Sequence, residues 1–223
     1  VILISGYDGG TGAAPRSSIH NAGLPWELGL SETHQTLIMN GLRNKVRIET
    51  DGKLMSGRDV AIAAILGAEE FGFATAPLVT MGCVMMRVCN LDTCPVGVAT
   101  QNPELRKRFK GKPEYVENFM KFIAQDLREY MAKLGVHSVD ELVGRTDLLK
   151  KGSGFYKEKA SRVDLSAILD NPYLGEKCIF DPEHVYDFHL EKTADERILM
   201  KKLKPALDKK QKRSIEVDVT NTD

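Results

Sequence analysis

The sequence lacks several features that would assign it to a common class of protein. Its 223 residues contain no apolar run that approaches the roughly 20 residues a membrane-spanning helix needs. Lysine plus arginine equals aspartate plus glutamate, 31 of each, so the charge favours neither nucleic acid nor an anionic membrane as the partner. Internal repeats and low-complexity tracts are also absent. These absences favour a soluble globular protein that binds small molecules or other subunits.

Cysteine is scarce, and its distribution is uneven. Of the four cysteines, Cys83, Cys89 and Cys94 lie close together, whereas Cys178 lies far away in a polar context and is given no role. A secreted disulfide scaffold would spread its cysteines more evenly. We therefore expect a reducing compartment, the cytoplasm or a plastid.

The apolar run of residues 1–4 is not expected to be a signal peptide, because neither a methionine nor a basic segment precedes it in the sequence. A continuous apolar run favours a strand that is buried in a parallel sheet. The neighbours of this strand on one side would have to come from residues outside the sequence. We therefore expect a fragment of a longer chain.

Strand and helix patterns alternate over the first 80 residues. The expected elements are a strand at 1–4, a helix at 28–42 with Ser31 as N-cap, a strand at 45–50, a helix at 58–66 and a strand at 70–78. This alternation predicts an α/β fold with a parallel sheet. Two successive strand and loop units whose loops could bind the same phosphate group resemble the last two units of an eight-stranded α/β barrel, where phosphate sites often lie. We expect the C-terminal portion of a (β/α)8 TIM-type barrel.

Glycine-rich turns follow two of these strands. The turn at 51–57 leads into a helix, where free N–H groups and the helix dipole suit a phosphate. Its spacing matches neither a Walker motif nor a dinucleotide fingerprint. The loop at 5–15 fits a ligand surface and a plain turn about equally well.

The second half of the chain is mostly helical. We expect helices near Pro103, at 114–134 and, from a capping-box pattern at Ser138 and Glu141, at 138–144. A polar connecting segment follows, and its basic run is interpreted as a solvated face. The expected domains are 1–149 for the barrel part with its 83–95 loop, 150–213 for the connecting segment, and 214–223 for the start of a following domain with a strand at 215–219.

The three clustered cysteines are spaced C-x5-C-x4-C, so a shared ligand requires the segment to fold back as a loop. A structural zinc site prefers four ligands on shorter spacings. The pair Cys94-Pro95 is typical of iron–sulfur loops, and a cluster of three irons and four sulfides needs only three cysteines. Inert buried thiols fit the same pattern. The spacing leaves the cluster, zinc and inert thiols open.

Ordered motifs of the chain resemble the synthase domain of the large subunit of glutamate synthase. These motifs lie at 4–13, 23–29, 49–52, 67–78 and 83–95. The resemblance is dense over residues 1–150 and looser in the connecting segment. It implies a barrel that binds FMN and makes the iron–sulfur cluster the favoured interpretation of the cysteines.

The resemblance also implies an activity. Reduced FMN would convert 2-iminoglutarate, formed from 2-oxoglutarate and glutamine-derived ammonia, into L-glutamate. Cys83, Cys89 and Cys94 would hold a 3Fe-4S cluster that passes electrons to FMN from a reductase subunit or ferredoxin. The remainder of the synthase chain, with its glutaminase domain, would be a further partner.

Specific residues follow from the matched motifs. On the phosphate side of FMN we expect Gly52, Lys53, Met55, Gly57, Gly72, Ala74 and Thr75. On the substrate side we expect Ser5, Asp8, Gly9, Gly10 and Thr11. Position 7 is tyrosine where the family has histidine, so no catalytic base is assigned.

Two other interpretations remain. The chain could be a non-catalytic barrel remnant that serves as a binding or subunit-interface module, because an exposed apolar strand requires a covering partner. It could also belong to an FMN oxidase with a zinc-stabilised loop. Iron, zinc and flavin contents separate these alternatives from the leading one.

Overall fold

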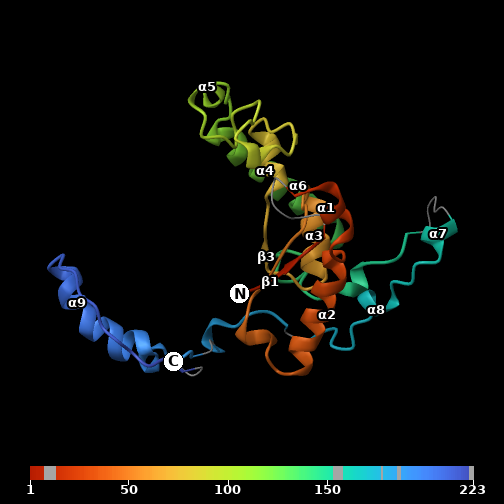
Figure 1. The fold of residues 1–223 in the computed structure, drawn as a ribbon. Helices are drawn as coiled ribbons and strands as arrows, with labels where there is room; N and C mark the ends of the chain where they lie inside the picture. Colours follow the sequence, from red (N-terminus) through yellow and green to blue (C-terminus); the bar gives the residue numbers. More distant parts are fainter. Residues whose placement is uncertain (8–13, 153–157, 177, 185–186, 221–223) are drawn as a thin grey trace. The chain divides into compact units, whose positions relative to one another are not determined.

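The computed structural model describes residues 1–7, 14–152, 158–176, 178–184 and 187–220. The chain forms two compact units, Val1–Pro182 and Glu183–Asp223, which are described one at a time (Figure 1). Among the described helices, none combines the length and the apolar composition that crossing a bilayer requires.

The described part of the first unit is an α/β structure. Its strands are β1 (Ile2–Ser5), β2 (Ile48–Asp51) and β3 (Glu70–Phe71). Its α-helices are α1 (Arg16–Asn21), α2 (Trp26–Met39), α3 (Gly57–Ile65), α4 (Thr75–Thr80), α5 (Pro103–Arg106), α6 (Pro113–Leu134), α7 (Glu158–Ser161) and α8 (Ser166–Leu169). Its 3₁₀ helices are η1 (Arg43–Lys45), η2 (Cys89–Leu91) and η3 (Thr146–Leu148).

The three strands form a parallel sheet in the order β1-β2-β3. Ile2 pairs with Ile48, and Glu49 pairs with Glu70. The predicted α/β alternation and parallel pairing are therefore confirmed. Within the described structure β1 is an edge strand and Leu3 is 51% exposed, so the predicted burial of β1 stays a prediction that depends on neighbours outside the sequence.

Helix α2 packs against β1 and β2, as Figure 1 shows. It begins at Trp26, directly after Pro25, and Trp26 and Leu30 enter the main hydrophobic core together with Ile48. The prediction of Ser31 as N-cap is wrong. Ser31 lies within the helix and is buried, and its hydroxyl donates to the carbonyl of Ile168 at 2.9 Å, so a tertiary contact has replaced the capping role.

Helix α3 packs against α6. Gly57 lies directly against α6, because an added Cβ would lie 2.8 Å from the Cβ of Asp126. Both helices were predicted, and α6 ends as expected at Gly135, whose φ is +75°. Because a side chain at position 57 would collide with α6, glycine at this position lets α3 begin directly against its neighbour.

Two expected elements after β2 have a different form. The expected strand at 70–78 is a strand only at β3, and α4 begins at Thr75; Pro77 cannot donate a sheet hydrogen bond but is accepted in the first turn of a helix. The capping-box bonds near Ser138 do form, since the amide of Glu141 donates to the Ser138 hydroxyl at 3.3 Å. The segment nevertheless forms turns instead of a helix.

Part of the expected connecting segment packs on the first unit. Asn171 donates its side-chain amide to the carbonyl of Gly144 at 2.8 Å, and the amide of Phe180 donates to the Glu69 carboxylate at 2.8 Å. The structure therefore places the boundary between the compact units after Pro182, whereas the composition of the sequence changes near residue 150.

The described part of the second unit is helical and extended. It contains η5 (Leu190–Lys192), the π-helix η6 (Asp195–Leu199) and α9 (Met200–Asp208), and η4 (Pro182–His184) lies at the boundary between the units. Residues 211–220 form no regular element, so the strand expected at 215–219 is not formed in the described chain. An alternating segment needs a neighbouring strand to become a β-strand.

A buried polar cluster connects the start of β3 to η1 and α2. Arg43 donates to His34 Nδ1 at 3.0 Å, to the carbonyl of Gly67 at 3.1 Å and to Glu69 Oε2 at 2.6 Å. His34 is 2% exposed, and its Nε2 has no partner within the described residues. Because Nδ1 accepts from Arg43, the ring proton is on Nε2 and the imidazole is neutral.

We expect this histidine to make the first unit sensitive to acid. Burial and, second, the charge of Arg43 lower the pKa of His34 to about 3. The folded pKa is below the unfolded value, so the stabilising contribution is complete above about pH 6.5 and is lost as the pH falls toward 3. An opening that exposes His34 should become about 2 kcal/mol easier between pH 7.5 and pH 5.

Hydrogen exchange on the full-length subunit, corrected for the intrinsic pH dependence of exchange, measures this effect at the amides around Gly67. The variant His34→Gln cannot titrate and should lose most of the pH dependence. An equal pH dependence in both proteins would contradict the assignment.

Candidate functional site

The three parallel strands end at one edge of the sheet, and a glycine follows each of them: Gly6, Gly52 and Gly72. The amide of Gly6 donates to the carbonyl of Asp51 at 3.1 Å, and that of Gly72 donates to the carbonyl of Thr50 at 2.8 Å. A Cβ at Gly52 would lie 2.9 Å from the Gly6 Cα. The turns after β1 and β3 thus both contact the end of β2, at the edge where α/β folds commonly bind ligands.

The turn after β2 has an unusual backbone. Gly52 and Lys53 both have positive φ angles, +122° and +70°. A Cβ at Gly52 would also lie 2.8 Å from Trp26 Cδ1, so this position accepts glycine alone without a rearrangement. Turns of this kind direct successive N–H groups toward one side, which suits an anion.

The N-terminus of α3 is already occupied by carboxylates. Ser56 caps the helix, and Asp59 accepts from the amides of Met55 at 2.9 Å and Ser56 at 3.0 Å. Asp126 of α6 accepts from the amide of Gly57 at 2.8 Å. The amides of Met55 and Gly57 are therefore directed to negative groups, and a phosphate there would have to displace them.

The N-terminus of α4 is different. Its N-cap, Ala74, makes no side-chain capping bond, and the first helical residue is Thr75. Gly72 lies against β2, where an added Cβ would be 2.9 Å from the Cβ of Asp51. The start of α4 thus has no side-chain cap and follows a turn that lies against the end of β2, and helix starts attract anions.

Only part of the expected substrate-side loop can be placed. Ser5 ends β1, and Tyr7 donates its amide to the carbonyl of Leu24 at 3.0 Å. Both line a cavity of about 390 Å³. The remaining members lie outside the described residues: Asp8, Gly9, Gly10 and Thr11.

A larger cavity, of about 710 Å³, joins the turn after β2 to the cysteine segment. Lys53 lines it from the turn, Arg87 and Asn90 line it from the cysteine segment, and Arg16 lines it from α1. Its volume is within the range of ligand sites, and its three long cationic side chains favour an anionic ligand.

The segment that carries Cys83, Cys89 and Cys94 folds back as a loop. All three thiols are free, and all three residues line one small cavity of about 40 Å³. Cys83 accepts from the amide of Met85 at 3.4 Å, and Cys89 begins η2. The segment thus folds as a loop that places the three cysteines around one cavity, whereas their role as ligands stays a prediction.

The backbone of this loop is unusual at several positions. Met85, Arg87 and Asp92 have φ angles of +54°, +57° and +56°. Left-handed conformations of non-glycine residues cost about 1–2 kcal/mol each and are concentrated at ligand-binding segments. The surrounding fold therefore holds the cysteine loop in a costly arrangement.

The surroundings of Cys94 favour its thiolate form. Burial raises the pKa of its thiol, but backbone N–H groups of Ala99, Val96, Val98 and Gly97 oppose this and lower the pKa below the usual value. A thiolate is the form of cysteine that binds metal. The donor set therefore fits a metal or cluster ligand better than an inert buried thiol.

The sulfur positions do not fit a single zinc ion. On one tetrahedral zinc, cysteine sulfurs lie about 3.8 Å apart. Within the described chain, three potential ligand atoms lie within 4.8 Å of one another only at Asp187, His189 and Glu191, and not at the three cysteines. Thiolates of an iron–sulfur cluster bind separate irons and stand farther apart. The three cysteines thus do not form such a compact group in the described chain.

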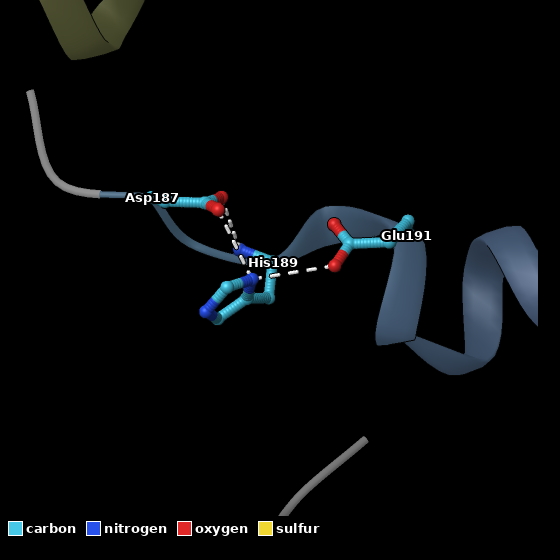
Figure 2. A group of neighbouring side chains, drawn as sticks. All are labelled: Asp187, His189 and Glu191. Carbon is cyan, nitrogen blue, oxygen red and sulfur yellow. Dashed lines mark hydrogen bonds and ion pairs between the residues drawn. The ribbon is translucent and has the colours of Figure 1, made fainter.

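The group of Asp187, His189 and Glu191 lies in the second unit (Figure 2). His189 Nδ1 is 3.1 Å from the Asp187 carboxylate and 3.3 Å from that of Glu191. All three side chains are exposed, so ion pairing in water accounts for the arrangement.

Some residues of the site were not predicted from the sequence. Asp59 could have been recognised, because a serine followed three residues later by an acidic residue is a capping signal. Asp126 could not, since it comes from α6, 69 residues after the amide it binds. Asp92 was also missed; the hydroxyl of Thr100 and then the amide of Gln101 lower its pKa and keep it ionised.

The fold and the site define an α/β protein in which a cavity lined by cationic side chains lies next to a loop of three thiols. Residues 1–137 match the family described as the conserved region in glutamate synthase. The chain belongs to this glutamate synthase family.

Relatives share high identity over much of this chain. The chain is 54% identical to the glutamate synthase [NADPH] large chain of Bacillus subtilis over its whole length, which is 14% of that protein. It is 48% identical to the glutamate synthase [NADH] of Saccharomyces cerevisiae, again over its whole length and 10% of that protein. It is 51% identical to the ferredoxin-dependent glutamate synthase 2 of Synechocystis over 77% of this chain and 11% of that one. The chain thus spans a small part of each relative.

Proposed function

We propose that this chain is the part of a glutamate synthase that binds FMN beside a 3Fe-4S cluster. The enzyme would make L-glutamate from 2-oxoglutarate and glutamine-derived ammonia by way of 2-iminoglutarate. The observation that carries the proposal is the 710 Å³ cavity, which Lys53 lines from the turn after β2 and Arg87 lines from the cysteine segment. The proposed flavin and cluster would thus be neighbours.

The proposed architecture is the C-terminal portion of a (β/α)8 barrel. Three parallel strands in sequential order, with α2 and α3 as the intervening helices, support it. In such barrels the ligand site lies at the carboxyl ends of the strands, which is where Gly6, Gly52 and Gly72 meet. The edge strand β1 is available to pair with a strand from the remainder of the synthase chain.

The phosphate of FMN would lie between two backbone features, the Gly52–Lys53 turn and the start of α4. The residues proposed to hold it are Gly52, Lys53, Gly72, Ala74 and Thr75. Met55 and Gly57 are left out, because carboxylates already accept from their amides. The flavin ring and substrate would face the loop of Ser5, Asp8, Gly9, Gly10 and Thr11.

The cluster would be held by Cys83, Cys89 and Cys94. Bound FMN would supply hydride transfer, and the cluster would supply single-electron transfer from a reductase subunit or ferredoxin. The chain itself orients and stabilises these groups. The N–H groups around Cys94 stabilise its thiolate, and Arg16, Lys53 and Arg87 attract anionic groups into the shared cavity. Free cysteines suit the cytoplasm or a plastid.

The composition of the anaerobically purified full-length subunit tests the proposal directly. We expect bound FMN, together with iron and sulfide in the ratio of a three-iron cluster. Flavin with zinc would support the zinc-loop alternative, and neither flavin nor iron would support the non-catalytic barrel module.

The variant Lys53→Met tests the anion site. Losing one charged contact to a phosphate should weaken FMN binding about 10-fold to 100-fold, because such contacts contribute about 1.5–3 kcal/mol. Flavin release, followed by fluorescence, measures this affinity. Lys45→Met is the matched control, since Lys45 is exposed and precedes β2 at the opposite end from the site. Equal FMN affinity in both variants would contradict the assignment.

A further inference from the structure

The loop that carries Cys94 is closed by a pair of residues that flank it. Asp92 Oδ1 accepts from the Thr100 hydroxyl at 2.6 Å and from the amide of Gln101 at 2.6 Å. The Thr100 hydroxyl also contacts the carbonyl of Asp92 at 3.0 Å. We call this pair, Asp92 and Thr100, the clamp.

Hydrogen bonds connect Thr100 of the clamp, through Asn102, to the start of α5. The Thr100 hydroxyl accepts from the amide of Asn102 at 3.1 Å. Asn102 in turn caps α5 by accepting from the amides of Glu104 and Leu105 at 2.9 and 3.3 Å. The closed end of the cysteine loop is therefore fastened to a helix start.

The backbone inside the clamp surrounds one sulfur. The amide of Gly97 donates to the carbonyl of Cys94 at 3.2 Å, which closes a tight turn after the cysteine. Gly97 has a φ of +77°, and an added Cβ would lie 2.9 Å from the amide nitrogen of Phe109, so the turn is packed closely against the chain after α5. Burial raises the pKa of the Cys94 thiol, and the backbone N–H groups of residues 96–99 outweigh this effect and lower it.

We propose that Asp92 and Thr100 are positioning residues that hold these N–H groups on the Cys94 sulfur and so raise the reduction potential of the cluster. The inference rests on the proposed function, in which Cys94 is a cluster ligand. Hydrogen bonds to cluster sulfurs favour the reduced state, because that state carries more negative charge. The clamp touches neither substrate nor flavin and acts through Cys94.

The charge of Asp92 has the opposite effect, which makes the test decisive. A nearby carboxylate disfavours the reduced cluster, so removing its charge alone should raise the potential. Loosening the clamp should lower the potential. The variant Thr100→Val breaks the clamp with no change of charge. Asp92→Asn removes the charge but keeps an oxygen that can accept, whereas Asp92→Ala removes both.

The experiment is a redox titration of the cluster by electron paramagnetic resonance in the full-length subunit. In Thr100→Val the ratio of reduced to oxidised cluster at a fixed potential should fall about threefold to tenfold, which is about 30–60 mV for a one-electron couple. The reduction potential of the cluster should be lower in Asp92→Ala than in Asp92→Asn. Thr100→Ser keeps the hydroxyl and should restore the wild-type value.

One variant serves as a control, and the results that would contradict the inference differ from those that would contradict the proposed function. Glu104→Ala removes an exposed carboxylate that pairs with Lys107 on the same helix start, and should leave the potential unchanged. The inference would be overturned if Thr100→Val had the same reduction potential as the wild type and Asp92→Ala had the same potential as Asp92→Asn. Partial loss of cluster does not disturb the comparison, since the potential is measured on the loaded fraction. A wild-type subunit without iron and sulfide would instead refute the proposed function.

Discussion

Replacing Cys89 with serine in the full-length subunit is expected to reduce glutamate formation with the physiological electron donor at least about 100-fold, while FMN stays bound. Serine oxygen is a poorer ligand for iron than thiolate, so the cluster should be lost or unstable. Cys89 is the most exposed of the three loop cysteines and begins η2, so the substitution should disturb the local packing little.

Three measurements on one preparation check this expectation. They are the rate of glutamate formation, the iron content and the FMN content. Cys178→Ala is the matched control, because Cys178 is a free cysteine that lines a different cavity, and it should keep both cofactors. Wild-type activity in Cys89→Ser would contradict the ligand role. Loss of FMN together with iron would contradict the separation of the two sites.

Replacing Arg43 with methionine should destabilise the first unit by about 3–5 kcal/mol. Arg43 is 3% exposed and pairs with Glu69, whose side chain is 8% exposed, at 2.6 Å. Without the guanidinium, Glu69 Oε2 and His34 Nδ1 lose their donor, and the buried carboxylate loses its opposite charge. The cost is therefore that of an uncompensated buried charge, which is much larger than that of a surface pair.

A second ion pair, which is exposed to solvent, provides the control. Arg47 and Glu70 are 3.6 Å apart with side chains 47% and 37% exposed, so Arg47→Met should cost no more than about 1 kcal/mol. Hydrogen exchange at the amides of Glu69 and Gly72 in the full-length subunit measures the local cost. Adding Glu69→Gln to Arg43→Met should recover part of the loss, because it removes the unpaired charge. Equal effects of Arg43→Met and Arg47→Met would refute this account.

Loss of Arg43 should also disturb the edge of the sheet at which the strands end and FMN is proposed to bind. Arg43 binds the carboxylate of Glu69, directly before β3, and Gly72 directly follows β3. Because β3 contains only Glu70 and Phe71, its position depends on what holds its two ends. We therefore expect FMN to be released more readily from Arg43→Met than from Arg47→Met.

The elements that were predicted well are those whose signals lie within a short stretch of chain. Helix α6 shows a long apolar period and ends at a glycine, and α3 has an N-cap serine and a closing glycine. The parallel pairing of β1 and β2 followed from an apolar strand that precedes a helix. The length of β3 was not predicted, because small residues around Ala74 fit a strand and a helix start equally well until their neighbours are known.

For the ligand edge, local sequence identified the turns but not which of their amides remain available. The motif at 51–57 favoured a phosphate at the start of α3, yet Asp126 reaches that start from a helix 69 residues later. Gly52 and Gly72 were assigned from the motif alone, while their contacts with Gly6 and Asp51 depend on strand register. Register is a property of the assembled sheet.

For Cys83, Cys89 and Cys94 too, the sequence shows some features of the site and only the tertiary structure decides the others. Their number, their spacing and the proline after Cys94 can be read from the chain, and they suffice to propose a thiolate site and to require a loop. The separation of the sulfurs, the N–H groups around Cys94 and the clamp of Asp92 and Thr100 arise only when the segment closes on itself and packs against α5. Residue type sets which chemistry a side chain can perform, because that is a property of its atoms. Distance and exposure decide which chemistry is available, because they depend on contacts between residues far apart in the chain.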